Sequence, residues 1–501
     1  MTNITEEHVD FKTFEKDLFQ LMCRIACEQI QKYLAWHDCT IMAIRDTKRY
    51  RYIQKDCKST IKTMFGEVTY YRRYYYDNVE LRYVHLLDEV IGINCGYGLI
   101  SENLAIQIVN ECADKSFRKA ANNISMYTGQ TISAQGAWNV FQQYSDAIGQ
   151  QETRLAELED SGSVGHLGNI STKVLFVEHD ELWISRQREK RRAKGTAVKG
   201  AKMIGRALGK QPMCVGSAYT GHSMDKNGRC NTVNKISYAS FGGSAKFRKK
   251  FRMLLNHCYD MDGVKHRLIN GDGEGWIKTE AEETDSILQL DPFHRSQAVI
   301  KSISNKVERQ QIFKAIKEKD VDSALGNIFD LVMDAYETED EKVQKKLSDL
   351  YKYFYNNKEN LLTWQERGVE LPSPPEGIIY RGMGIQESNN CTYTFRMKHH
   401  RGAWSEYGAD NMARILSYRS TIGLETILGT LPESDPIVEI YAEPLSAAQT
   451  PKHDGKGYAA DWLHAPMPFE EAFKTNGREA IRNMLRTKPL SGRVVNAIAR
   501  Q

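Results

Sequence analysis

Two aspartates in this sequence follow short apolar runs that are expected to form buried strands. Val264–Ile269 leads into Asp272, which has a glycine on each side, and Val174–Val177 leads into Asp180. A carboxylate at a strand end with open space beside it is a favoured place for a ligand or metal in an α/β fold. Asp-Gly turns are also common without any function. The second acid of the same kind makes a metal site the better interpretation.

A third acid is expected from the helix that begins shortly after residue 404, where Glu406 and Asp410 are the two possibilities. Capping of that helix is the alternative explanation for both residues. Three converging carboxylates would suit two Mg²⁺ (or Mn²⁺) ions, because Mg²⁺ takes oxygen ligands. Two such ions ~3.5–4 Å apart support phosphodiester cleavage or strand transfer. Neither an HExxH zinc motif, nor a P-loop, nor GxGxxG occurs.

Basic residues are concentrated in three segments, although the net charge is only +4. They are residues 186–210 (including Arg186, Arg188, Lys190, Arg191 and Arg192), residues 246–252 (including Lys249 and Lys250), and the tail from Lys474 to Arg500. A solvated face would explain any one cluster. Together they favour a nucleic-acid partner.

The N-terminal part of the chain predicts a helix followed by a β-hairpin. Residues 7–38 carry a stripe that we expect to face the core, made of Phe11, Phe14, Leu18, Leu21, Met22, Ile25, Ile30, Tyr33 and Leu34. Residues 61–76 are β-branched and aromatic, with a turn at Gly66-Glu67. Arg72 and Arg73 in the hairpin are candidates for gripping a DNA backbone, while cross-strand packing explains the neighbouring tyrosines equally well.

Residues 101–148 predict three helices opened by Ser101, Ser116 and Ser133, which is the outline of a helix-turn-helix. A generic helical hairpin has the same pattern. If the unit binds DNA, Ser133, Gln135, Trp138 and Asn139 face the groove.

The rest of the chain predicts a mixed α/β sheet with acids at its strand ends. Strands are expected at 174–177, within 212–241, at 264–269 and at 391–397, with a long helical stretch over about 295–364. The 138 positions from Asp272 to Asp410 exceed what a sheet-to-helix connection needs, so we expect a helical insertion.

The ten scattered cysteines contain no CxxC pair and suggest a reducing cytosol, and no apolar run approaches the ~20 residues of a membrane span. We therefore expect no membrane association.

Several motifs occur in an order that resembles the bacterial ISLre-type insertion-sequence transposases, related to Mutator-like enzymes. They are TIKTMFGEVTYYRRYYYD, LLDEVIGI, SFRKAANNISMYTGQTISAQGAWNV, FVEHDELWI, NGDGEGWIK, LDPFHRSQAV and RGAWSEYGADNMARI, spread over about residues 60–420. The resemblance implies a DDE transposase with an RNase H-like catalytic domain. It implies that Asp180 is the first acid, although Glu181 stands where the family more often has glycine, and that Asp272 is the second. Asp410, or alternatively Glu406, would be the third, with Asp291, His294 and Trp404 as auxiliary residues.

The expected domain order follows from these assignments. An N-terminal helix and hairpin occupy 1–100, a helix-turn-helix-like segment 101–150, the catalytic domain 165–294 and 391–430, the helical insertion 295–390, and a basic region 431–501. The expected function is cleavage of element ends and joining of the 3′-hydroxyl to target double-stranded DNA, in the bacterial cytoplasm at the nucleoid, by a homodimer or larger oligomer. The alternatives are a metal-dependent nuclease of the same fold and a decayed, DNA-binding derivative.

Overall fold

A computed structural model describes residues 11–92, 99–161, 168–187, 209–337, 340–399 and 402–424. The chain divides into two compact units, one formed by residues 1–107, 123–132 and 433–501 and the other by residues 108–122 and 133–432. Arg188, Lys190, Arg191, Arg192 and the basic region 431–501 lie outside the described residues.

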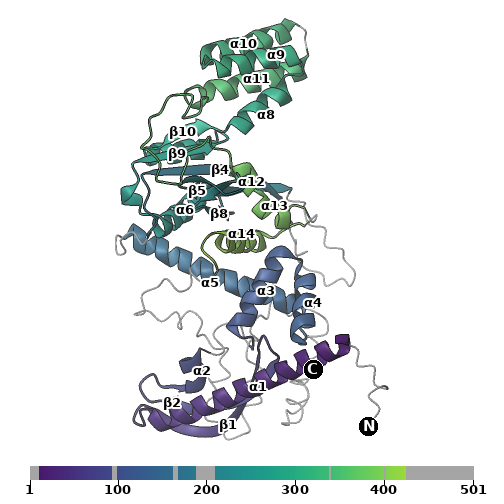
Figure 1. The fold of residues 1–501 in the computed structure, drawn as a ribbon, viewed down its shortest axis with the longest axis vertical. Coiled ribbons are helices and arrows are strands. Elements are labelled where there is room, and N and C mark those ends of the chain that lie inside the picture. Colours follow the sequence, from purple (N-terminus) through teal and green to yellow (C-terminus); the bar gives the residue numbers. More distant parts are fainter. Residues whose placement is uncertain are drawn as a thin grey trace, which may run out of the picture. The chain divides into compact units, whose positions relative to one another are not determined.

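The first unit contains one long helix and a three-stranded antiparallel sheet in the order β1-β2-β3 (Figure 1). The elements are α1 (Phe11–Ile44), β1 (Tyr50–Lys62), β2 (Glu67–Asp77), β3 (Arg82–Val84) and α2 (Leu86–Ile91). The predicted hairpin and its turn are confirmed, because β1 pairs with β2 from Tyr50↔Asp77 to Lys62↔Glu67.

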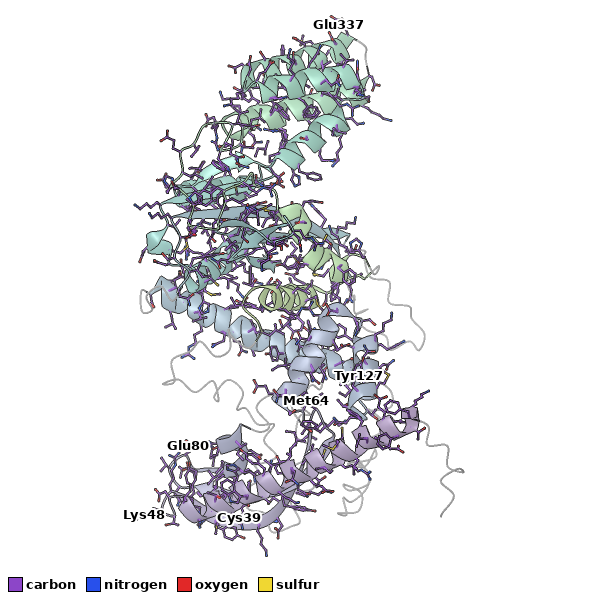
Figure 2. The ribbon with its side chains drawn as sticks, viewed as in Figure 1. Cys39, Lys48, Met64, Glu80, Tyr127 and Glu337 are labelled. Carbon is purple, nitrogen blue, oxygen red and sulfur yellow. The ribbon has the colours of Figure 1, made fainter. Side chains whose placement is uncertain are left out.

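Only one half of α1 packs on this sheet. Leu34 and Ile41 are buried together with Val68, Tyr70 and Tyr75 of the hairpin, and Figure 2 marks Cys39 in this half. The prediction of a core-facing stripe is wrong for the other half. Six of its residues are exposed, namely Phe11, Phe14, Leu18, Leu21, Met22 and Ile25, and Tyr33 in the packed half is exposed as well.

Three helices follow at the predicted positions. They are α3 (Glu102–Asp114), α4 (Phe117–Thr128) and α5 (Ala134–Asp160). Ser133 caps α5, since its hydroxyl accepts a hydrogen bond from the Gly136 N–H at 2.9 Å. The helix that Ser133 opens, α5, continues for 27 residues. Apolar positions on its second half, such as Ile148 and Leu155, are buried.

The second unit is built on a five-stranded mixed sheet in the order β10-β9-β4-β5-β8 (Figure 1). β10, β9 and β4 are parallel, and β5 is antiparallel to both of its neighbours. The strands are β4 (Val174–Ser185), β5 (Lys210–Tyr219), β8 (Ile236–Ser240), β9 (His266–Gly271) and β10 (Ile287–Leu290), with a hairpin of β6 (Gly221–Met224) and β7 (Cys230–Val233) between β5 and β8. The central strand β4 is buried along most of its length, as the run Val174–Val177 predicted.

Helices from distant parts of the chain pack together beside β5 and β8. They are α5, α6 (Ser244–Cys258) and α14 (Glu406–Thr421). Their interface holds Glu152 of α5, which is completely buried and accepts hydrogen bonds from Tyr238, Lys250 and Arg414. Buried charges require such partners because an unpaired ion is costly away from water.

Shorter elements complete the second unit. A 3-10 turn, η1 (Met261–Gly263), precedes β9, and α7 (Gly275–Glu283) follows it. The long helical stretch expected over about 295–364 is present as α8 (Pro292–Ser302), α9 (Lys306–Lys317), α10 (Val321–Glu337), α11 (Glu341–Asn356) and η2 (Lys358–Asn360). These helices share an apolar core that includes Ile312, Ile328 and Phe354.

The strand predicted over 391–397 is wrong. The segment forms helix α13 (Cys391–Met397) directly after α12 (Gln386–Asn389). Tyr393, Arg396 and Met397 are buried, and this three- and four-residue spacing matches one face of a helix. Packing of that face therefore outweighs the β-propensity of alternating Thr, Tyr and Phe.

Candidate metal centre

The register of two parallel strands places Asp180 and Asp272 at the same level of the sheet. The last β4–β9 pair is Glu178↔Asn270, and each aspartate lies two residues further along its own strand direction. Asp180 is not at a strand end as predicted, because β4 continues to Ser185 against β5. It lies instead just beyond the part of β4 that β9 covers. The edge of β4 that pairs with β9 up to Glu178 is therefore open to other groups at Asp180.

Asp180 is held by two hydrogen bonds and faces an imidazole. Its Oδ1 accepts from the Glu181 N–H at 2.7 Å, and its Oδ2 accepts from Asn390 Nδ2 at 2.6 Å. The Nε2 atom of His294 lies 3.8 Å from Oδ1. The Asp180 residue is 7% exposed, so its carboxylate orientation is fixed by protein groups rather than by solvent.

Asp291 positions His294 by starting helix α8. Its Oδ1 accepts from the backbone N–H groups of Phe293 and His294, at 2.7 and 3.3 Å. Its Oδ2 accepts from Asn270 Nδ2 at 2.7 Å. Since these contacts occupy both oxygens, Asp291 is a helix cap that ties α8 to β9. The spacing of the Asp-x-x-His pair therefore has a structural cause.

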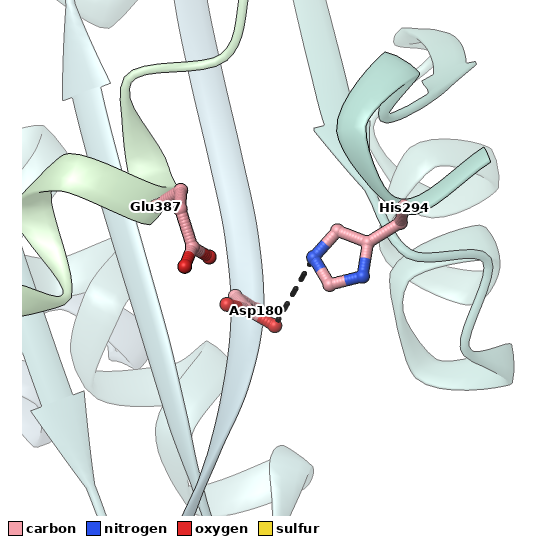
Figure 3. Close-up of side chains that lie close together, drawn as sticks. All are labelled: Asp180, His294 and Glu387. Carbon is pink, nitrogen blue, oxygen red and sulfur yellow. Dashed lines mark ion pairs between the residues drawn. The ribbon is translucent and has the colours of Figure 1, made fainter. Parts of the chain in front are cut away.

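Glu387, on the short helix α12, joins Asp180 and His294 in a group that could hold a metal ion (Figure 3). One ligand atom from each residue lies within 4.8 Å of the others. Glu387 is not among the residues predicted from the sequence. It follows the long insertion on a helix of four residues, which is too short to leave a periodic signal. The only local signal is an acid shortly after Gly384 and just before a pair of asparagines.

The segment that carries Glu387 is attached to the sheet through Glu178, a completely buried residue of β4. One Glu178 oxygen accepts from the Gly384 N–H at 2.9 Å and the Tyr219 hydroxyl at 2.8 Å, and the other from the Gln386 N–H at 3.1 Å. Asn270 Nδ2 lies 3.4 Å from this second oxygen. Burial raises the pKa of Glu178, and the donors oppose that shift. Glu178 thus fixes the backbone on the N-terminal side of Glu387.

Asp272 is not part of the group formed by Asp180, His294 and Glu387 among the described residues, but its carboxyl interacts electrostatically with Asp180 and His294. Burial raises the pKa of its carboxyl, the negative charge of Asp180 raises it further, and His294 opposes the shift. Its Oδ1 accepts from the Glu274 N–H at 3.1 Å, and its backbone carbonyl accepts from the Tyr353 hydroxyl of α11 at 2.8 Å. Burial is the largest cause of the raised pKa, and the smaller contribution of Asp180 is the effect expected of two carboxylates that lie near one another.

The glycines beside Asp272 are required by close packing. A Cβ on Gly271 would lie 2.7 Å from Ile277 Cδ1, and one on Gly273 would lie 2.9 Å from the Asn357 amide oxygen. Gly273 also has a φ of +93°, a conformation that favours glycine. A larger residue at either position would therefore displace Ile277 or Asn357 beside the turn.

Glu181 does not crowd a turn, because the chain forms no turn there. It continues strand β4, and its Oε1 accepts from Trp276 Nε1 at 3.1 Å. Burial raises the pKa of Glu181. The tryptophan therefore keeps this additional carboxyl in a defined place.

The structure does not place Glu406 or Asp410 in this group. Asp410 accepts from Lys246 Nζ at 2.8 Å, from Arg414 Nη2 at 3.1 Å and from the Phe241 N–H at 3.0 Å. Glu406 is exposed and pairs with Arg186 at 3.2 Å. Both acids line a separate open hollow of about 340 Å³ with Phe241, Lys246 and Tyr407. Asp410 is already neutralised by two cations, which does not suit a metal ligand.

Trp404 has a packing role. Its indole Nε1 donates to the Met397 carbonyl at 3.1 Å, and its backbone N–H donates to Ser185 at the end of β4 at 3.0 Å. The tryptophan therefore attaches the segment before α14 to the sheet.

Most of the described residues predicted to bind DNA have partners within the protein. Arg72 pairs with Asp88, Arg73 with Asp38, Arg186 with Glu406, and Lys250 with buried Glu152. Lys249 pairs with Asp160 at 2.7 Å at a more exposed position. Gln135 and Asn139 lie on α5 and hydrogen-bond to each other at 2.9 Å. Arg72, Arg73 and Lys250 thus have roles in holding their own units together.

The chain belongs to the uncharacterised protein family UPF0236, whose family model matches residues 4–426. One UPF0236 protein of Caldanaerobacter subterraneus subsp. tengcongensis is 23% identical over 401 residues, covering 79% of this chain and 75% of the relative. That relative is named by eleven gene designations. A UPF0236 protein from Streptococcus gallolyticus is 22% identical over 435 residues, covering 83% of this chain and 86% of the relative.

Weak structural similarity extends to DDE transposases. The Drosophila P element transposase strand transfer complex gives a TM-score of 0.20 with 10% identity, covering 65% of this chain and 80% of that one. The Mos1 strand transfer complex gives a TM-score of 0.13 with 8% identity, covering 51% and 76%. In the described part of the chain, no helix has the length and apolar character to cross a membrane.

Proposed function

We propose that this protein is a DDE-type DNA transposase of an insertion sequence, with Asp180, Asp272 and Glu387 as its acidic triad. The observation that carries the proposal is the convergence of Asp180, His294 and Glu387 within 4.8 Å, with Asp272 electrostatically coupled to Asp180. These residues come from β4, α8, α12 and the turn after β9. Three acids and a histidine brought together from four separate elements are not explained by helix capping.

The donor set fits divalent cations. Carboxylate oxygens are the ligands that Mg²⁺ and Mn²⁺ prefer, and buried Asp180 would otherwise repel Asp272 and Glu387. Two such ions, when bound, supply an activated oxygen nucleophile and stabilise the leaving oxygen of a phosphodiester. We propose that Asp180, Asp272 and Glu387 hold the ions, while Asn390 and the Glu181 N–H orient Asp180 and His294 borders the site.

The architecture of the second unit supports an RNase H-like catalytic domain. Strands β4, β5 and β8 are neighbours in the sheet and run antiparallel to one another in turn. Parallel strands β9 and β10 extend the sheet on the β4 side. We propose that this domain comprises residues 165–294 together with the chain from α12 to about residue 430, and that α8–α11 and the loops after them form the insertion. The proposed DNA partner would be held by the basic segments and by α3–α5.

A relative offers independent support from its name. The name of one Caldanaerobacter protein of the same family carries eleven gene designations, all from a single strain. Multiple copies of one gene in one genome are expected of a mobile element. The same observation does not favour a host nuclease, which a cell needs in one copy. A nuclease of the same fold and a decayed DNA-binding derivative are the rival functions.

The proposal is tested with the full chain and DNA that contains the ends of its own element. With Mg²⁺ or Mn²⁺, we expect cleavage at the ends and joining of the 3′-hydroxyl to target DNA, and we expect both to be lost in Asp272→Asn. Asp334→Asn, at an exposed position of α10, is the matched control and should retain both steps.

Each of the other possible results would indicate one of the rival functions or an error in the site. Cleavage without joining would indicate a nuclease. Binding that weakens steeply with salt, without cleavage, would indicate the decayed form. Unchanged cleavage and joining in Asp272→Asn would show that the assignment of the metal site is wrong.

A further inference from the structure

The first half of α1 presents an apolar row that the described residues of its own unit leave exposed. Phe11, Phe14, Leu18, Leu21 and Ile25 are exposed, from 40% at Ile25 to 73% at Phe11. The residues of α1 that face the hairpin belong to another side of the helix and include Cys27, Ile30, Leu34 and Ile41. The row is therefore additional to the face that packs on the sheet.

The spacing of the row is that of a coiled coil. The steps from Phe11 to Phe14, Leu18, Leu21 and Ile25 alternate between three and four residues, which are the a and d positions of two heptads. At 1.5 Å per residue the row is about 21 Å long. An a/d row fits the same row on another helix, because each side chain inserts between four on the partner.

This part of α1 is exposed along its whole length. Every residue from Phe11 to Met22 is exposed, and in Figure 1 this half of the helix extends past the hairpin. An isolated helix shorter than ~12–15 residues is marginal in water. Contiguous apolar surface of this kind also marks a contact site rather than a solvated face.

The charges around the row favour a protein partner over a phosphate surface. Residues 11–25 carry Lys12, Lys16 and Arg24 against Glu15 and Asp17. Such a balance gives no field that would attract DNA or an anionic membrane. It also gives no net repulsion strong enough to keep two copies of the same helix apart.

We infer that residues 11–25 of α1 form a short coiled coil with the same residues of a second copy of this chain. The a and d row is self-complementary, so a second copy satisfies it without any other partner. The two copies are joined through their first units, and the metal centre of each copy remains complete in its own chain. This inference does not depend on the proposed transposase activity.

The first experiment compares two glutamate substitutions on the same helix, made in the full chain. Leu18→Glu places a charge in the row, whereas Gln20→Glu adds the same charge at an exposed position outside it. By sedimentation equilibrium we expect a dimer for the wild type and for Gln20→Glu. We expect the dimer dissociation constant of Leu18→Glu to rise by more than about tenfold, with an unchanged circular dichroism spectrum and Mn²⁺ affinity.

A second experiment identifies the occupant even if Leu18→Glu does not fold. Phe14 is replaced by a photoreactive phenylalanine in a mixture of ¹⁴N- and ¹⁵N-labelled full chains. Cross-linked peptides that pair α1 of one label with α1 of the other are expected. Cross-links from Phe14 only to the same chain, for example to residues 425–501, would overturn the inference, as would a monomeric wild type.

Discussion

The carboxylate of Glu178 accepts a hydrogen bond from the backbone N–H of Gln386 at 3.1 Å, across 208 positions of sequence. Glu178 lies two residues before Asp180 on β4, and Gln386 lies immediately before Glu387. One buried acid thus connects the backbone segments that supply two members of the proposed triad. It does so without facing the centre as a ligand.

Replacing Glu178 with glutamine should weaken metal binding without removing a ligand. The amide NH₂ of glutamine would face N–H donors, so at least one of the contacts to Gly384, Tyr219 or Gln386 must be lost. Changes of this kind beside a metal site lower metal affinity by about 10- to 100-fold. Titration calorimetry with Mn²⁺ measures the effect, and Glu376→Gln, at an exposed position of the loop before α12, is the control. Wild-type affinity in Glu178→Gln would contradict the positioning role.

The identity of the third acid is decided by three substitutions measured side by side. Glu387→Gln should abolish Mn²⁺ binding and DNA cleavage, because it removes one of the three carboxylates proposed to hold the ions. Glu406→Gln should leave both unchanged. Asp410→Asn should lower the unfolding temperature rather than the Mn²⁺ affinity, because it disturbs contacts to Lys246 and Arg414. If Asp410→Asn lost Mn²⁺ binding but kept its unfolding temperature, the third acid would be Asp410 of α14 and not Glu387.

Metal binding should weaken with acid at a higher pH than an ordinary carboxylate would dictate. The pKa of Asp272 is raised above its usual value of 3.8, first by burial and then by Asp180. A metal must displace the proton from this carboxyl, so Mn²⁺ affinity should begin to fall while ordinary aspartates are still ionised. Affinities measured as a function of pH in the wild type and in His294→Gln separate the carboxyl effect from the imidazole. A pH dependence that disappears entirely in His294→Gln would contradict a role for Asp272.

The buried ion cluster around Glu152 predicts unequal costs for two arginines of α14. Arg414 is 6% exposed and pairs with buried Glu152 at 2.9 Å, so Arg414→Met should lower the free energy of unfolding by about 3–5 kcal/mol. Arg419 pairs with Asp114 near the surface, so Arg419→Met should cost no more than about 1 kcal/mol. Urea unfolding monitored by circular dichroism measures both. Equal costs would show that Glu152 tolerates the loss of Arg414.

The same cluster gives a pH dependence of stability. Burial raises the pKa of Glu152, but Arg414 and Lys250 outweigh that effect and hold the pKa below its usual 4.5. A lowered folded-state pKa contributes stability above pH 4.5 that is lost as the pH falls below that value. Urea unfolding at a series of acidic pH values should show this loss in the wild type and much less of it in Glu152→Gln.

The sequence predicted the parts of the site that depend on local pattern. Asp272 and its two glycines were recognisable because a buried strand, a tight turn and an acid are adjacent in the chain. Asp180 was recognisable from the apolar run before it, although the continuation of β4 past it depends on pairing with β5, which no local pattern announces.

The parts that depend on distant contacts were not predictable in this way. Glu387 reaches Asp180 only because Glu178, Asn390 and the insertion fix the return of the chain. The first half of α1 has the periodicity of a core-facing helix, and periodicity alone does not tell whether the partner of an apolar row is the same chain. Segment 391–397 has strand-like residues, yet its buried face is set by packing on α14.

His294 and Glu387 are 93 positions apart in the chain (387 − 294 = 93), yet their ligand atoms are neighbours. The chain therefore leaves the sheet at α8 and returns to the same centre at α12. Its two attachment points are fixed by Asp291 and by Glu178, which belong to the sheet and its helix cap rather than to the bundle. Since the ends are close together, the helices far from the centre, α9 and α10, can change in length while the ends of the segment and the contact of α11 to Asp272 stay in place.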